Sequence, residues 1–263
     1  MHQSYTWKDL QDIIERLRGE NGCPWDRVQT HESLRADLLE EAYEAVDAID
    51  RGDMENLKEE LGDVLMQVVF HASLEAGKGG FTLDDVVQGI CEKMIYRHPH
   101  VFGDGSADTA EQVLINWEAL KKKEKQLETQ TDVLKSVPAA LPALTRARKV
   151  QKKAADVGFD FDDVGGALRK VEEEIRELQE AWEQPDGNLE EEFGDILFAL
   201  VNVARFLKIN PEFALTKATK KFINRFEYVE NSALSEGKQL SKMTLEEMDL
   251  LWDKAKEALS KKV

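Results

Sequence analysis

The chain has 263 residues, of which 42% are hydrophobic and 33% are charged, and its formal net charge is −17. This composition is typical of a folded protein with a highly charged surface and argues against a disordered chain. An acidic chain repels phosphate backbones and anionic lipids, so we expect neither a nucleic acid nor a membrane as a partner.

The lack of a targeting signal and the pattern of cysteines predict a soluble, cytoplasmic protein. The longest clean apolar run, residues 196–201, is far too short to cross a bilayer. The first 17 residues lack the apolar core of a signal peptide. Cys23 and Cys91 form no CxxC pair, so we interpret them as free thiols in a reducing compartment.

Apolar residues that recur with the period of a helix predict an all-α protein with about five helices in each half. The helices expected in the first half lie near residues 6–18, 33–50, 54–76, 83–96 and 109–127. Those expected in the second half lie near residues 142–157, 165–183, 188–207, 212–235 and 245–260. Two starts carry capping signals: Asn210 before Pro211, and Thr244 with Glu247.

The two halves carry the same motifs in the same order, which indicates a tandem duplication. The EExxE pattern occurs at residues 40–44 and 173–177, and the pattern LxEE[LF]GD[VI]L occurs at residues 57–65 and 189–197. Three further pairs share their spacing: Lys93 and Arg97 with Lys221 and Arg225, Trp117 and Lys121 with Trp252 and Lys256, and Trp25-Asp26 with Phe159-Asp160.

The duplication predicts two helical domains, at residues 1–128 and 142–263. Residues 129–141 lie between them, contain Pro138 and carry no strong apolar stripe. We therefore expect this stretch to be a linker.

Pairs of acidic residues three apart predict a metal site, because residues at that spacing lie on one face of a helix. Two such helices packed antiparallel would direct four carboxylates at one point, which suits Mg²⁺, with Mn²⁺ as a possible substitute. The acids concerned are Glu41, Glu44, Glu60 and Asp63 in the first half, and Glu174, Glu177, Glu192 and Asp195 in the second. The alternative for each motif is a solvated helix face with ordinary ion pairs, but the duplication favours the metal site.

In each half the acidic pair of the second box, Glu60 and Asp63 or Glu192 and Asp195, lies beside an apolar stripe. We therefore expect these acids at the rim of a core. There the pKa of these acids would be raised unless a cation binds. A glycine precedes each aspartate, Gly62 in one half and Gly194 in the other, and each costs about 1 kcal/mol in a helix interior. We expect a partner helix or a ligand to approach the backbone there. The first-half stripe consists of Leu57, Leu61, Val64, Leu65 and Val68.

Basic and aromatic residues recur at matching positions and are candidates for holding a triphosphate. Lys221 and Arg225 share a helix face, as Lys93 and Arg97 do. For any single pair the alternative is a solvated basic face. A tryptophan at these positions can stack on a base or belong to the core. We interpret the two histidines around Pro99 as part of a loop and not as metal ligands, and the absence of Glu-x-x-His pairs argues against a di-iron site.

The EExxE and ExxD boxes, together with GCPWD at residues 22–26 and RHPHVF at residues 97–102, resemble the all-α nucleoside triphosphate pyrophosphohydrolases and, among them, the MazG family. The resemblance implies two tandem MazG-like helical domains whose four-helix cores are completed in a homodimer. It implies Mg²⁺-dependent hydrolysis of ribo- and deoxyribonucleoside triphosphates, with broad specificity, to monophosphate and pyrophosphate. It also implies a housecleaning or stress-linked role.

The resemblance assigns roles to residues of both halves. The eight acids above fall on metal-ligand positions, and Glu173, Glu174 and Glu177 of the second EExxE box fall on catalytic positions. We favour the second half as the working one, because its acidic boxes are denser. The nucleotide- and phosphate-contacting positions fall on Lys221, Arg225, Trp252 and Lys256, and on Lys93, Arg97, Trp117 and Lys121.

Two other functions stay open at this point. One is a pyrophosphohydrolase with a narrower substrate, such as dUTP, a modified nucleotide or phosphoribosyl-ATP. The other is a regulatory or partner-docking module that binds nucleotide without turnover. A substrate panel separates the first from a broad enzyme. Stabilisation by nucleotide without pyrophosphate release would indicate the second.

Overall fold

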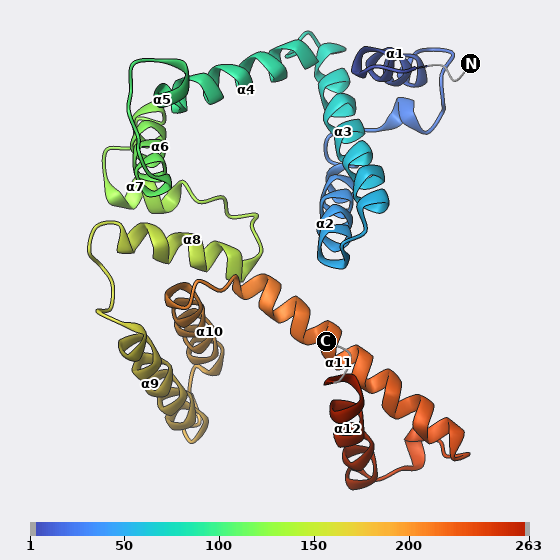
Figure 1. Cartoon of the computed structure of the whole chain (residues 1–263), viewed down its shortest axis with the longest axis vertical. Helices are drawn as coiled ribbons and strands as arrows, with labels where there is room; N and C mark the ends of the chain where they lie inside the picture. The colour runs from blue at the N-terminus through green and yellow to red at the C-terminus, as the bar shows by residue number, and fades with distance from the viewer. Residues whose placement is uncertain (1–3, 261–263) are drawn as a thin grey trace. The chain divides into compact units, whose positions relative to one another are not determined.

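The structure, a computed structural model, describes residues 4–260, and every regular element in that range is helical. The predicted all-α class is therefore confirmed. The outermost residues of the two predicted domains, 1–3 and 261–263, lie outside the described range. The chain divides into two compact units, residues 1–121 and 122–263 (Figure 1).

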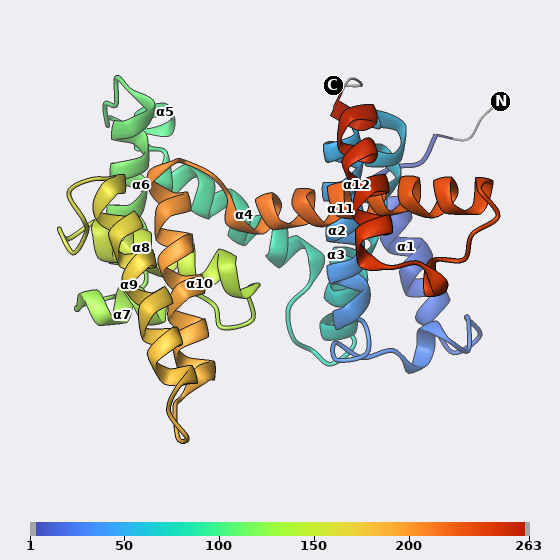
Figure 2. The same ribbon diagram turned by 90° about the horizontal axis from the view of Figure 1, so that it is seen from below.

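The first unit is built around the antiparallel hairpin of α2 and α3, which lie side by side in Figures 1 and 2. Gly52 ends α2 in the left-handed conformation, and Asp53 caps α3 by accepting a 3.1 Å hydrogen bond from the backbone nitrogen of Asn56. Helix α1 packs on α3 and closes a core that includes Ile14 and Phe70. The helices are α1 (Trp7–Arg18), η1 (Asp26–Val28), α2 (Arg35–Arg51), α3 (Met54–Ala76), α4 (Leu83–Arg97), α5 (Pro99–Phe102) and α6 (Ala110–Glu124).

The second unit repeats this hairpin as α9 and α10, with Asn188 capping α10. Helix α8 packs on both α10 and α11, and α11 forms a second hairpin with α12 around Val229, Ala233 and Leu251. The helices are α7 (Gln130–Lys135), α8 (Ala143–Ala155), α9 (Val164–Trp182), α10 (Leu189–Phe206), α11 (Pro211–Ser235), η2 (Leu240–Lys242) and α12 (Leu245–Ser260).

The long helices follow the predicted ranges to within about three residues at each end. Both predicted caps are confirmed. The side chain of Asn210 accepts from the first turn of α11, and the Thr244 side chain accepts from the backbone nitrogen of Glu247. The stretch around Pro99 was predicted as a loop, and this was wrong. Proline is well suited to a first helical turn, and Pro99 begins the short helix α5.

The stretch predicted as a linker, residues 129–141, contains α7. Thr129 and Asp132 form a capping box at its start, and Val133 and Val137 are buried where α7 packs on α8. The two compact units divide before this stretch, between Lys121 and Lys122. Residues 129–141 therefore belong to the second unit.

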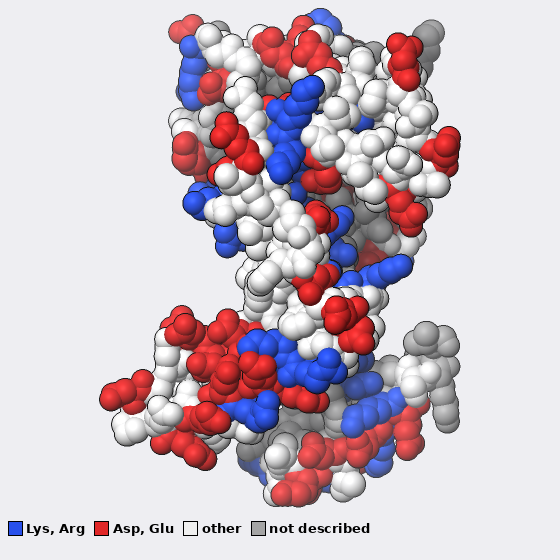
Figure 3. Space-filling view, turned by 90° about the vertical axis from the view of Figure 1, so that its left-hand side faces the viewer, with Lys and Arg blue, Asp and Glu red and all other residues white. Residues whose placement is uncertain are grey.

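On the face drawn in Figure 3, acidic and basic side chains are interspersed with broad uncharged areas. Within residues 4–260, no helix combines the length and the apolar character that a membrane span requires. Cys23 is half-buried and Cys91 is exposed, and both are free thiols, as predicted.

Candidate functional site

The two hairpins each bring three carboxylates together. In the first unit, one oxygen each of Glu41, Glu60 and Asp63 lie within 4.8 Å of one another. Glu41 comes from α2 and the other two from α3, so the cluster forms in the seam between the helices. The second unit repeats the arrangement between α9 and α10 with Glu174, Glu192 and Asp195.

The fourth acid of each set also reaches its cluster. Glu44 and Glu177 are exposed on α2 and α9, one turn beyond the clustered glutamate of the same helix. The Glu44 carboxyl lies close enough to Glu60 to raise the pKa of Glu60, and the Glu174 carboxyl raises the pKa of Glu177 in the same way. All eight predicted acids thus gather in two groups of four.

These carboxylates are held together at an electrostatic cost. Burial raises the pKa of Glu41, and the charges of Asp63, Glu44 and Glu60 raise it further. Burial also raises the pKa of Glu60, although Asn56 donates a 3.0 Å hydrogen bond to its Oε1. An all-oxygen donor set with this uncompensated charge fits a hard divalent cation, which would remove the repulsion.

The acids are partly buried, as expected, but the apolar stripe does not form the core of the single chain. Glu60 is only 9% exposed, whereas Leu61, Leu65 and Val68 of the stripe are exposed, Leu61 to 54%. The acids face the neighbouring helix α2, whereas Leu57 and Val64 of the stripe are half-buried and its other three residues face outward. In the second unit Glu174 is 5% exposed while Phe193 is 55% exposed, so both hairpins bury acids and present apolar residues.

The two glycines before the aspartates have open surroundings. A Cβ added at Gly62 or Gly194 would meet no atom within 4 Å. The expected close approach therefore does not occur within the described residues of this chain. The glycines leave the backbone bare on the same hairpins that present the apolar stripes.

The basic and aromatic motifs meet in both halves. The Arg97 guanidinium carbon lies 5.2 Å from the centroid of the Trp117 ring, and Arg225 lies 5.8 Å from that of Trp252. Trp252 also packs against Phe222, with ring centroids 5.0 Å apart, and it borders the core between α11 and α12. Each tryptophan is half-buried, so it belongs partly to the core and still presents an edge to solvent.

The remaining predicted contact residues lie at the surface or pair locally. Lys93 and Lys221 are exposed, Lys121 pairs with Glu118 at 3.7 Å, and Lys256 pairs with Asp253 at 2.9 Å. In the second unit the carboxylates lie on α9 and α10, while the basic and aromatic residues lie on α11 and α12, and Figure 1 shows α11 leading away from the acidic hairpin. Among the described residues of the second unit, the two sets therefore lie on separate pairs of helices.

The motif search missed Lys170, a residue of the second acidic cluster. Its ammonium lies 2.7 Å from Oε1 of Glu173 and 2.7 Å from Oε1 of Glu174. The contacts lower the pKa of Glu173. The signal was present in the sequence, because Lys170 precedes these acids by three and four residues on one helix.

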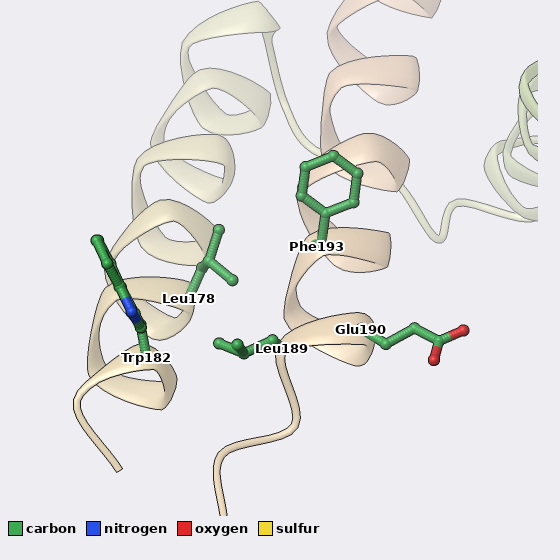
Figure 4. Close-up of a pocket in the computed structure, with 5 residues that line it drawn as sticks. All are labelled: Leu178, Trp182, Leu189, Glu190 and Phe193. Carbon is green, nitrogen blue, oxygen red and sulfur yellow. The ribbon is translucent and has the colours of Figure 1, made fainter. Parts of the chain in front are cut away.

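A cavity of about 470 Å³ opens at the loop end of the α9–α10 hairpin. Leu178 and Leu189 point toward each other between α9 and α10, while Glu190 points away (Figure 4). Trp182 and Phe193 complete the lining. Because the lining is almost wholly apolar, this hollow continues the exposed apolar face of α10.

The model of the MazG nucleotide pyrophosphohydrolase domain matches residues 29–102 and 165–230, together more than half of the chain. The chain belongs to the MazG family. Each match contains one acidic hairpin, so the chain consists of two tandem MazG helical domains. Family membership makes it a hydrolase of the nucleotide pyrophosphohydrolase type. The tryptophan motifs around Trp117 and Trp252 lie outside both matches.

Full-length relatives support the assignment to the MazG family. The nucleoside triphosphate pyrophosphohydrolase/pyrophosphatase MazG of Thermotoga maritima is 46% identical over 250 residues, which cover 95% of each chain. The nucleoside triphosphate pyrophosphohydrolase of Escherichia coli K12 is 44% identical over 251 residues, covering 94% of this chain and 95% of the relative. YabN of Bacillus subtilis is 53% identical over 255 residues, but this chain spans only 52% of YabN.

Proposed function

We propose that the chain hydrolyses ribo- and deoxyribonucleoside triphosphates at the α-phosphorus, with Mg²⁺, to monophosphate and pyrophosphate. The observation that carries the proposal is the pair of carboxylate clusters, each with one buried glutamate and each within a MazG match. The relatives from Thermotoga maritima and Escherichia coli, named for nucleoside triphosphates, support this class of substrate.

In the second half, Glu174, Glu177, Glu192 and Asp195 would hold the metal. When bound, Mg²⁺ supplies charge neutralisation at the triphosphate and lowers the pKa of water. Mn²⁺ has similar ligand preferences and can substitute. The first-half set would be Glu41, Glu44, Glu60 and Asp63.

One carboxylate of the second EExxE box, drawn from Glu173, Glu174 and Glu177, accepts the proton of the attacking water. The contact with Glu174 raises the pKa of Glu177, and burial raises it further, so Glu177 binds a proton more readily than an ordinary glutamate. Water attacks the α-phosphorus, the bond to the bridging oxygen of the β-phosphate breaks, and pyrophosphate leaves. Lys221 and Arg225 meet the charge of the leaving group.

The complete site forms in a homodimer. The apolar face of α10 is exposed at Phe193, Leu197 and Leu200, and that of α3 at Leu61 and Leu65. A second copy packed on these faces would complete a four-helix core and leave the acids in its interior. It could also supply the basic and aromatic residues that lie on separate helices within one chain.

We propose broad base specificity and a role in clearing nucleotides from the pool during normal growth or stress. Base recognition would come from the half-buried Trp252 beside Arg225. Aromatic and guanidinium stacking is tolerant of base identity, because every base has a π-face. Lys256 would add a charge near the phosphates.

The deciding experiment measures pyrophosphate and monophosphate release from the canonical NTPs and dNTPs, with and without Mg²⁺. The Glu177→Gln and Glu44→Gln variants identify the working half. We expect Mg²⁺-dependent pyrophosphate from most substrates, lost in Glu177→Gln. Release of inorganic phosphate would place the attack at the γ-phosphorus and overturn the mechanism. Stabilisation by nucleotide without any product would indicate a binding module.

A further inference from the structure

The two acidic clusters differ by one internal cation. In the second half, the Lys170 ammonium bridges Glu173 and Glu174, at 2.7 Å from each. Glu174 is one of the clustered acids and its side chain is buried, whereas the lysine side chain is 37% exposed. A positive charge therefore already lies against one of the carboxylates that would bind a metal.

The first half has the opposite charge at the corresponding place. Lys170 stands four residues before Glu174, and Asp37 stands four residues before Glu41. Within residues 4–260, no lysine or arginine forms an ion pair with Glu41, Glu60 or Asp63. The repulsion between those acids is therefore not balanced by a cation of the protein.

The two halves also differ one helical turn beyond the clustered aspartate, where the first half has the more polar residue. Gln67 stands four residues after Asp63 and therefore lies on the same face of α3. It is 4% exposed, and its Oε1 has no hydrogen-bond partner. The second half has Ala199 at this position, which offers no oxygen. The first half thus has an additional buried oxygen one turn from Asp63 and, among its described residues, no ion-paired cation beside its clustered acids.

We propose that Lys170 is an internal counter-ion that competes with the divalent cation, so that the first-half site loads metal at a lower concentration than the second-half site. A metal entering the second cluster must displace the ammonium or bear its repulsion. The flexible four-carbon stem of lysine allows displacement. Lys170 is thus a positioning residue that holds Glu173 and Glu174 in the metal-free state. The inference rests on the proposed function in taking the clustered carboxylates as metal ligands.

The test measures Mn²⁺ binding to the full chain in the absence of nucleotide. Electron paramagnetic resonance reports the concentration of free Mn²⁺. Each half is measured alone, with Glu41→Gln and Glu44→Gln silencing the first and Glu174→Gln and Glu177→Gln silencing the second. We expect the first half to bind at least about tenfold more tightly. Lys170→Met should tighten second-half binding about tenfold or more, because it removes one unit charge beside the ion. Asp37→Lys changes the local charge by two units and should weaken first-half binding by at least as much.

Lys170→Arg is the matched control, because it keeps the charge and should leave the affinity near that of the wild type. Thermal melts establish that every variant is folded. Equal affinities in the two halves, or no change in Lys170→Met, would overturn this inference while leaving pyrophosphate release unaffected. Absence of Mn²⁺ binding in both halves would overturn the metal-ligand assignment itself. Hydrolysis is measured separately on the wild type, so its failure is distinguishable from either result.

Discussion

The guanidinium of Arg225 lies over the ring of Trp252 at 5.8 Å, and Arg97 repeats this contact with Trp117 at 5.2 Å. The duplication therefore preserved a tertiary contact as well as a motif, although the partners come from separate helices. The two arginines differ in how exposed their side chains are to solvent. Arg97 is buried, whereas Arg225 is half-buried and can still reach a ligand. This difference favours the second half for phosphate binding.

Arg225→Lys tests that assignment. Lysine keeps the charge but loses the planar fork and the stacking surface, so we expect kcat/KM for nucleoside triphosphates to fall about tenfold or more. Steady-state pyrophosphate release measures it. Arg97→Lys is the matched variant and should change kcat/KM much less. The reverse order of the two effects would move the working site to the first half.

The carboxylate ligands can be removed without removing their volume. Glu177→Gln and Asp195→Asn should lower kcat by at least about a thousandfold, because a metal site loses charge and a ligand together. The melting temperature should be kept, since the amides are isosteric and relieve repulsion. Glu44→Gln and Asp63→Asn are the controls in the first half. Full turnover in both second-half variants would remove these residues from the site.

Stability should depend on pH through Glu60. Its pKa is raised chiefly by burial and by neighbouring carboxylates, so the folded state disfavours the ionised form. The destabilisation is complete above the raised pKa and disappears as the pH falls to the ordinary value of 4.5. Without metal, Glu60→Gln should melt above the wild type at neutral pH, with a difference that shrinks toward acid. Excess Mg²⁺ should abolish or reverse the difference, as thermal melts would show. A difference independent of pH and Mg²⁺ would contradict the site.

Most helices could be predicted because their signals are local. The caps at Asn210 and Thr244 and the apolar period each depend on residues within a turn or two. The orientation of the acids could not be read the same way. The stripe of Leu61 and Leu65 was taken as the core, but α2 packs on the acidic face of α3 instead. A helix with two usable faces does not reveal which one its neighbour covers.

The site itself was predicted in part. The spacing within each box places its acids on one face, and the structure gathers them in the seams between helices. The approach expected at Gly62 and Gly194 depends on molecules outside the chain, which no local pattern describes. Lys170 was recoverable from its spacing to Glu174. It was missed because the search followed motifs shared by both halves, and this lysine is a difference between them.

A second pH effect of opposite sign should come from His71. The Nδ1 atoms of His31 and His71 lie 2.8 Å apart, and Nε2 of His31 lies 2.8 Å from Oε1 of Glu75. Burial lowers the pKa of His71, and the charge of His31 lowers it further. The folded state thus prefers neutral His71, and stability should fall as the pH falls through 6.5. His71→Val should flatten the pH dependence of the melting temperature between about pH 7.5 and pH 5.5. An unchanged slope would contradict this.

The homodimer is tested on the apolar face of α10. Leu197 is 41% exposed in one chain, and a charge at this position would have to be buried in the proposed interface at a cost of several kcal/mol. Leu197→Asp should therefore yield monomers by light scattering after gel filtration. It should also lose pyrophosphate release, because the basic residues of α11 lie apart from the carboxylates of their own chain. Val28→Asp, at an exposed apolar residue outside both hairpins, is the control and should stay dimeric and active. A fully active monomer would show that one chain closes the site by itself, with α11 folding back onto the α9–α10 hairpin.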